Sequence, residues 1–99
     1  MSEARLEQQA AGRGRLSGPL TFATVPQLFQ QGRQLFADSN NLQLDLAGVE
    51  RSDSAGLALL VSWVRLAQQH GGTITFLNVP QQLLGLARVG GVDQVLIFT

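Results

Sequence analysis

Apolar and polar residues follow two alternating spacings along this chain. Segments with a period of two, typical of strands with one buried face, are separated by segments with a period near 3.6, typical of amphipathic helices. Glycine, proline and asparagine mark the breaks, with Gly18-Pro19 expected to end the first strand and Gly48 the second. The pattern predicts strands at 15–20, 42–46, 73–77 and 95–98, and helices at about 24–37, 54–69 and 80–88.

The alternation of strands and helices predicts the fold class. Parallel neighbouring strands need crossover connections, so this order is typical of an α/β domain. We expect a single domain over residues 1–99, with a mixed, mainly parallel sheet of four to five strands and about three helices packed on it. Residues 1–14 fit two interpretations, an irregular edge strand around Arg5 to Gln9 or a flexible tail.

The helix expected at 54–69 is apolar on two opposite sides. The stripe expected to face the sheet consists of Leu57, Leu60, Val61 and Val64. The opposite stripe consists of Leu59, Trp63 and Leu66. A helix that is apolar on opposite sides is buried on both, so the second stripe contacts either the neighbouring helices or another protein. Trp63 is the only tryptophan of the chain, and tryptophan is enriched at protein interfaces.

The segment Asp53-Ser54-Ala55-Gly56-Leu57 lies where a strand turns into this helix. Aspartate and serine are common N-caps, and either Asp53 or Ser54 suits that role. The free N–H groups and the helix dipole at the same place favour an anion, so a phosphate on Ser54 is the alternative interpretation. Such a phosphate would add negative charge at the edge of any docking surface there and weaken binding.

Composition narrows the classes of partner. The formal net charge is zero and charged residues make up only 14% of the chain. So low a share of charge fits two interpretations, a surface partly covered by a partner or a surface whose polarity comes from glutamine. The seven basic residues are all arginine and are scattered, which argues against nucleic-acid binding. The longest unbroken apolar run, 57–61, is far shorter than the roughly 18 residues that span a bilayer. No polybasic segment indicates direct membrane binding.

The residues of this chain give little support for an enzyme or a metal-binding protein. The chain has no cysteine and no lysine, which excludes thiolate zinc sites and a lysine-containing phosphate loop. The one histidine, His70, is at the far end of the predicted helix from Ser54, so these two residues do not form a catalytic pair. We expect no enzymatic activity, no cofactor and no metal, and a cytoplasmic location because no apolar signal segment begins the chain.

Taken in order, these motifs resemble the STAS domain family over about residues 15–98. The resemblance rests on Leu44-Asp45-Leu46 with Val49, on Asp53 to Leu57, on the long apolar helix, and on Gly71-Gly72 before the strand at 73–77. Two subfamilies compete. In the anti-sigma factor antagonists a partner kinase phosphorylates the serine that Ser54 matches. The MlaB subfamily comprises the STAS subunits of the Mla phospholipid ABC transporter. Two segments of this chain resemble segments of MlaB proteins, Leu16-Ser17-Gly18 and Asp53 to Leu60.

Two departures favour the MlaB subfamily. The antagonists usually continue Gly-Leu-Gly-Val, where this chain has Gly56-Leu57-Ala58-Leu59. They also usually carry two acidic residues in a Gly-Glu-hydrophobic-Asp segment, where this chain has Gly18-Pro19-Leu20-Thr21. Ser54 points the other way, because it stands where a threonine can occur in MlaB proteins.

The resemblance to MlaB implies a concrete role. It implies a non-catalytic subunit at the cytoplasmic face of the inner membrane that binds and supports the ATPase of the transporter, and through it the permease and lipid-binding subunits. The system maintains the lipid asymmetry of the outer membrane. We expect the docking face to consist of Ser54, Ala55, Gly56, Leu59 and Trp63. Phe29 on the first helix is a further candidate, although a core role fits it better.

Overall fold

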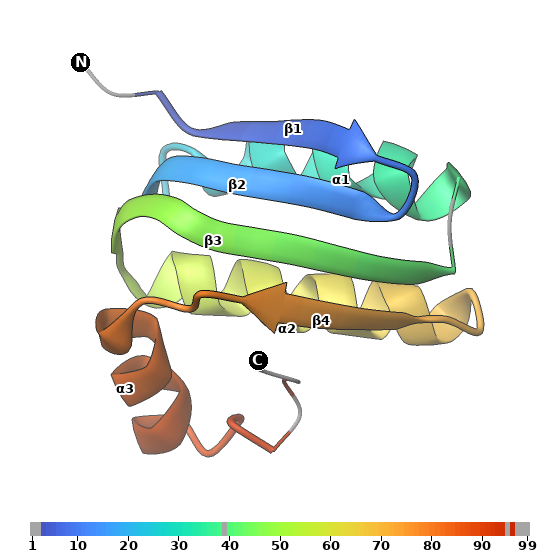
Figure 1. Cartoon of the computed structure of the whole chain (residues 1–99). Coiled ribbons are helices and arrows are strands. Elements are labelled where there is room, and N and C mark those ends of the chain that lie inside the picture. The colour runs from blue at the N-terminus through green and yellow to red at the C-terminus, as the bar shows by residue number, and fades with distance from the viewer. Residues whose placement is uncertain (1–2, 39, 95, 97–99) are drawn as a thin grey trace.

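The helices and strands follow the predicted order, with one strand added at the start (Figure 1). The computed structural model describes residues 3–38, 40–94 and 96. The strands are β1 (Arg5–Ala10), β2 (Arg13–Leu20), β3 (Asn41–Ser52) and β4 (Thr73–Leu77). The helices are α1 (Val25–Asp38), α2 (Ser54–Gln69) and α3 (Gln81–Val89). The beginning of the chain is therefore an edge strand. The strand predicted at 95–98 lies outside the described residues, apart from Leu96.

The strands form one sheet in the order β1-β2-β3-β4. β1 pairs with β2 as an antiparallel hairpin, whereas β2 with β3 and β3 with β4 are parallel. This is the mixed, mainly parallel sheet that the sequence predicts. Its parallel part arises because a helix carries the chain back before each of β3 and β4.

The helices pack on one face of the sheet only. α1 and α2 lie behind the sheet in Figure 1, while the face toward the viewer carries no helix among the described residues. α3 lies beside the start of α2, where the Gln82 side chain accepts a hydrogen bond from the Ser52 N–H at 3.1 Å. The strands bury alternate side chains toward α1 and α2, and the largest of these are Leu16, Leu20, Leu44, Leu46 and Phe76.

The end predicted for the second strand is wrong, whereas the first strand ends at Leu20 as predicted, with the expected break at Gly18-Pro19 lying inside it. β2 continues through Gly18-Pro19, and β3 continues through Gly48 to Ser52. The pairing of β2 with β3 shifts register at Arg15/Ser17 and again at Gly18/Pro19, so bulges absorb the irregular residues instead of ending the strands. Gly18 has φ +84°, a backbone conformation that glycine adopts without strain.

The two apolar stripes of α2 are the margins of one broad buried surface. Leu59 and Trp63 are 1% and 0% exposed, and Leu60 and Val64 of the other stripe are buried as well. Small residues lie between the stripes, so the helix sinks deeply between the sheet and α1. The second stripe therefore contacts α1 within the domain, and a Cβ on Gly32 of α1 would overlap the indole of Trp63.

Gly32→Ala tests this contact. We expect the added methyl group to lower the free energy of unfolding by about 1–3 kcal/mol, the usual cost of overfilling a packed core. Chemical denaturation measures the difference. Gly85→Ala is the matched control, because Gly85 is also helical and a Cβ there meets no atom within 4 Å. The control should be neutral or up to about 1 kcal/mol more stable. Equal effects at the two glycines would contradict this account of the α1–α2 contact.

Asp45 joins β3 to the loop after β4 on the face without helices. Its Oδ1 accepts hydrogen bonds from the Ala47 N–H at 2.8 Å and from the Asn78 side-chain amide at 3.1 Å. Asn78 has φ +56°, which asparagine tolerates better than most residues. The Ala47 hydrogen bond, then the Asn78 hydrogen bond and the charge of Arg15, hold the pKa of Asp45 below its ordinary value.

This shift predicts an acid dependence of stability. A carboxyl group with a lowered folded-state pKa stabilises the protein above its ordinary pKa of about 3.9, and loses that contribution as the pH falls through the folded-state value. The stability difference between the protein and Asp45→Asn should be constant near neutral pH and shrink below about pH 4. Urea denaturation across this range measures it, with the exposed Asp93→Asn as control. A difference independent of pH would contradict the role of the charged form.

Candidate functional site

The carboxyl ends of the parallel strands β2 and β3 lie next to each other at one end of the sheet. There the Asp53 N–H donates to the Leu20 carbonyl oxygen at 3.1 Å, which ties the start of α2 to the loop before α1. That loop is ordered by Thr24, whose hydroxyl donates to the Pro19 carbonyl at 2.8 Å and accepts from the Thr21 N–H at 2.9 Å. Two loops that are distant in sequence are thus held side by side.

Asp53 is the N-cap of α2. Its backbone is extended and its Oδ1 accepts a hydrogen bond from the Ala55 N–H at 2.8 Å. Ser54 is the first residue of the helix and is exposed. Of the two capping candidates the structure selects Asp53, so the hydroxyl of Ser54 is presented at a helix N-terminus without being needed as its cap.

Gly56 lets α2 approach the sheet closely. A Cβ at this position would overlap the Ser52 hydroxyl and come within 2.8 Å of the Leu20 Cβ. Gly56 and its neighbour Ala55 are both buried. These two motif residues therefore have a structural role in seating the first turn of the helix.

The residues of the predicted docking face differ in their exposure. Ser54 is exposed and Phe29 is half-buried at the surface, but Ala55, Gly56, Leu59 and Trp63 are buried. Trp63 is wholly enclosed, so the expectation that it offers its indole to a partner is corrected. The physical reason is the approach of α1 at Gly32, which the helical periodicity of α2 does not reveal.

A shallow, mainly apolar groove lies between α1 and α2. It encloses about 250 Å³, and we call it the docking groove, lined by Val25, Pro26, Phe29, Ala58, Leu59 and Ser62. The walls are mainly apolar side chains. The groove keeps two of the predicted residues, Phe29 and Leu59, and adds four that the sequence analysis missed.

A signal for this groove exists in the sequence. Ser54, Ala58 and Ser62 recur at every fourth position, so these small residues form one row along α2. Ser54 and Ala58 are exposed and Ser62 is half-buried. A row of small side chains beside a larger apolar one, Phe29, leaves a shallow depression on the helical side of the molecule.

Phe22 is a second feature that the sequence analysis missed. It lies in the loop between β2 and α1, and 75% of its side chain is exposed. The hydrogen bond between Asp53 and Leu20 holds this loop beside the start of α2. Aromatic side chains are enriched in protein interfaces, so Phe22 is a further candidate contact residue.

The part of the chain that the structure describes offers neither a cluster of metal ligands nor a membrane-spanning helix. No group of three or more histidine, cysteine, aspartate or glutamate side chains there is arranged to hold a metal ion. None of the helices described is long and apolar enough to cross a bilayer.

Comparisons with known proteins agree with the fold. The family model described as "Mlab, STAS domain" matches residues 5–98. A comparison with curated protein sequences finds no match.

Solved structures include several similar chains. An anti-sigma factor antagonist from Mycobacterium paratuberculosis is 23% identical with a TM-score of 0.76, covering 99% of this chain and 85% of that one. The Bacillus cell fate determinant SpoIIAA in its phosphorylated form is 15% identical with a TM-score of 0.72, covering 97% and 90%. The murine anion transporter Slc26a9 is 25% identical with a TM-score of 0.68, covering 88% of this chain but 15% of the transporter.

The cap at Asp53 and the exposure of Ser54 predict different effects for neighbouring substitutions. Asp53→Ala removes the side-chain acceptor of the Ala55 N–H and should lower the free energy of unfolding by about 0.5–2 kcal/mol. Ser54→Ala removes an exposed hydroxyl and should change it by less than about 0.5 kcal/mol. Asp53→Ser restores an acceptor and should recover most of the loss. Chemical denaturation measures all three, and a larger loss at Ser54 than at Asp53 would reverse the assignment of the cap.

Proposed function

The chain belongs to the STAS domain family, and on that premise we propose that it is a non-catalytic accessory subunit of a phospholipid-transporting ABC complex of the Mla type. In this role it binds the ATPase subunit and supports its active, assembled state, and through the ATPase it joins the permease and lipid-binding subunits. It acts in the cytoplasm, peripheral to the inner membrane, and contributes to the lipid asymmetry of the outer membrane. The proposal involves no nucleic acid and no insertion of the chain into the bilayer.

The observation that supports this proposal is the docking groove next to Ser54. An apolar depression bounded by Phe29 and by the small residues Ala58 and Ser62 accommodates side chains from a partner helix or loop. Phe22 adds an exposed aromatic side chain at the end of the sheet from which α2 begins. Ser54, at the start of the same row, supplies a polar contact at the margin, where interfaces are typically more polar.

The alternative function is that of an anti-sigma factor antagonist regulated by phosphorylation of Ser54. One observation favours it specifically: Ser54 is exposed at a helix N-terminus whose cap is a different residue. A phosphate there gains from the helix dipole while leaving the Asp53 cap in place. The similar antagonist structures share the fold with this chain at 15–23% identity, which bears on the fold and leaves the partner open.

A binding experiment separates the two functions. The tagged chain is purified from its native cells under mild detergent, and its partners are identified by mass spectrometry. We expect an ABC ATPase with its permease. A serine kinase or a sigma-factor regulator in its place, together with phosphate on Ser54, would support the alternative and overturn the transporter role.

Ala58→Glu tests the groove as the contact surface. It places a charge in an apolar depression, and we expect affinity for the ATPase to fall at least tenfold, or about 1.4 kcal/mol. Gln68→Glu is the matched control, because it adds the same charge at an exposed position of α2 outside the groove. Binding measurements with the purified ATPase give the affinities of both variants. Equal affinities for the two variants would show that the ATPase contacts another surface.

A further inference from the structure

Among the described residues, the outer edge of β1 pairs with no strand. β1 pairs with β2 on one side, and no other strand in the described part of the chain pairs with it (Figure 1). An open edge presents unpaired backbone N–H and C=O groups to any strand that can lie beside it. Proteins usually protect such edges with charged side chains, and β1 carries Arg5 and Glu7.

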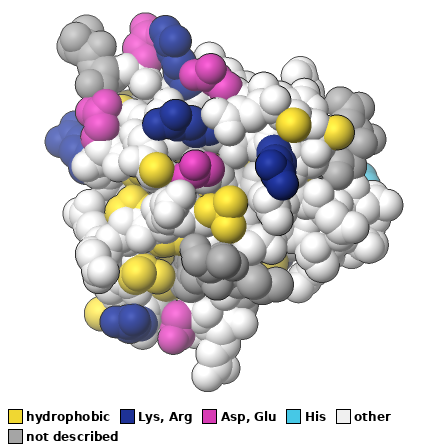
Figure 2. Space-filling view, in the orientation of Figure 1, with side chains coloured by type: hydrophobic (Ala, Val, Ile, Leu, Met, Phe, Trp, Pro, Cys, Tyr) yellow, Lys and Arg dark blue, Asp and Glu magenta, His cyan; other side chains and the backbone are white. Residues whose placement is uncertain are grey.

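The charges on the face without helices form an alternating row that ends at this edge. Asp45 of β3 lies opposite Arg15 of β2, and Arg15 lies opposite Glu7 of β1. Opposite charges that face each other across neighbouring strands stabilise their pairing. Charged side chains of both signs are mixed over the upper part of this face, where β1 and β2 lie (Figure 2). The row ends with a carboxylate at the open edge, so a strand added there is favoured by an arginine opposite Glu7.

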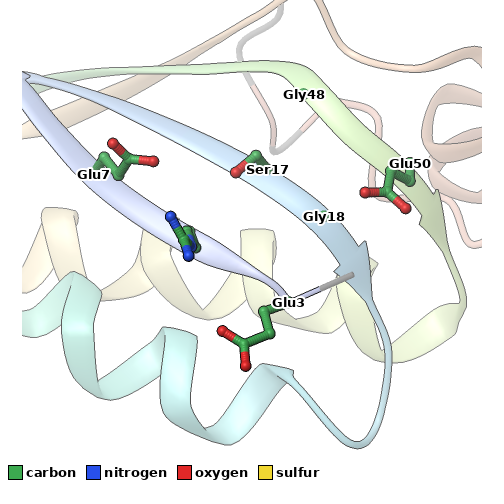
Figure 3. Close-up of a pocket in the computed structure, with 7 residues that line it drawn as sticks. Glu3, Glu7, Ser17, Gly18, Gly48 and Glu50 are labelled. Atoms are coloured by element: carbon green, nitrogen blue, oxygen red, sulfur yellow. The ribbon is translucent and has the colours of Figure 1, made fainter. Parts of the chain in front are cut away.

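A hollow next to this row contains further carboxylates. It encloses about 380 Å³ between β1, β2 and β3, where Ser17 and the two glycines Gly18 and Gly48 contribute little side-chain volume. Figure 3 shows Glu3, Glu7 and Glu50 around it. One guanidinium, that of Arg5, lines the same hollow. Glu3 and Glu50 thus add two carboxylates to that of Glu7, against the single guanidinium of Arg5, so this face is suited to a further cationic side chain.

We propose that a second copy of this chain pairs with β1 in antiparallel fashion, around a two-fold axis through Leu6. Pairing that keeps the helices of both copies on the same side of a joint sheet brings odd positions opposite odd positions. A register centred on Arg5 sets arginine against arginine, and one centred on Glu7 sets glutamate against glutamate. The register centred on Leu6 sets Arg5 opposite the partner's Glu7, and Glu7 opposite the partner's Arg5.

The same register also suits the side of β1 that faces the helices. Leu6 is half-buried at the margin of the core and is paired with the partner's Leu6. It borders a hollow of about 350 Å³ that is also lined by Gln8, Gln31 and Leu35. The Gln31 Oε1 atom is buried, with no hydrogen-bond donor among the described residues. A second copy supplies apolar side-chain atoms and amide donors to this hollow, which solvent otherwise fills.

The charges of β1 therefore have a selective effect. They oppose pairing with an apolar strand, because each charge would lose water without gaining a partner. Pairing with an identical strand brings two opposite-charge contacts at once. The paired edge shares no residue with the docking groove, so a dimer of this kind carries two uncovered grooves. The inference concerns another surface and holds whether or not the proposed function is correct.

Charge-reversal variants test the register in solution. We expect the purified chain to form a dimer in sedimentation equilibrium at micromolar to submillimolar concentrations, more strongly at low salt. Arg5→Glu and Glu7→Arg should each be monomeric, because each sets like charges in opposition. An equimolar mixture of the two variants should form a heterodimer, since every opposed pair is then complementary. Arg65→Glu, on the exposed side of α2, should leave the dimer unchanged.

A disulfide experiment tests the two-fold axis without altering charge. The chain contains no cysteine, so Leu6→Cys introduces a single thiol that faces its own copy across the axis. Directly opposed antiparallel residues have Cα atoms about 4.5–5.5 Å apart, within the range for a disulfide. We expect rapid oxidative cross-linking. Gln9→Cys on the same strand is the matched control, because the two thiols would be about 20 Å apart in this register.

The results of these dimerisation experiments do not depend on whether the ATPase binds the docking groove. A monomer at all concentrations, or a dimer that survives either single change, Arg5→Glu alone or Glu7→Arg alone, would overturn the pairing. Equal cross-linking at positions 6 and 9 would overturn the register. If a single charge variant fails to fold, the double variant Arg5→Glu/Glu7→Arg still tests the pairing, because it restores both complementary contacts and should dimerise like the original chain.

Discussion

The indole of Trp63 lies against the backbone of Gly32, and the separation of α1 from α2 depends on this contact. Without a side chain at position 32, the two helices approach closely enough to share one apolar layer above the sheet. Trp63 is fully enclosed as a result, together with Leu59. The same approach leaves only a shallow depression between the outer surfaces of the helices, which is the docking groove. A core contact thus determines the shape of the surface through which the domain is proposed to act.

Burial on one side of the sheet divides the molecule into surfaces of different chemistry. The helical side presents an apolar groove and the exposed Phe22, whereas the other face of the strands presents alternating charges. Apolar depressions favour partners that lose water on binding, and charged rows favour partners with a matching register. The groove and the β1 edge also share no residue, so the two proposed contacts do not compete.

Neighbouring residues at the start of α2 have different roles, some structural and one at the surface. Asp53 caps the helix, Ala55 and Gly56 are buried to seat its first turn, and Ser54 alone is exposed. Ser54 can therefore act as a contact, or accept a phosphate, while the helix keeps its own cap. This division explains how one fold suits both an accessory subunit and a phosphorylated regulator.

The fold class and most of the helices and strands could be predicted from local sequence patterns, because hydrophobic period and helix caps are local properties. The bounds of α2 and β4 follow from spacing alone, and the STAS resemblance rested on motifs read in order. The tertiary structure decided what local patterns do not encode. It carried β2 and β3 through their glycines, because cross-strand pairing stabilises a bulge that looks like a break in one strand. It also moved Trp63 from the expected docking face into the core and assembled the groove from α1 and α2, because burial depends on the approach of segments distant in sequence.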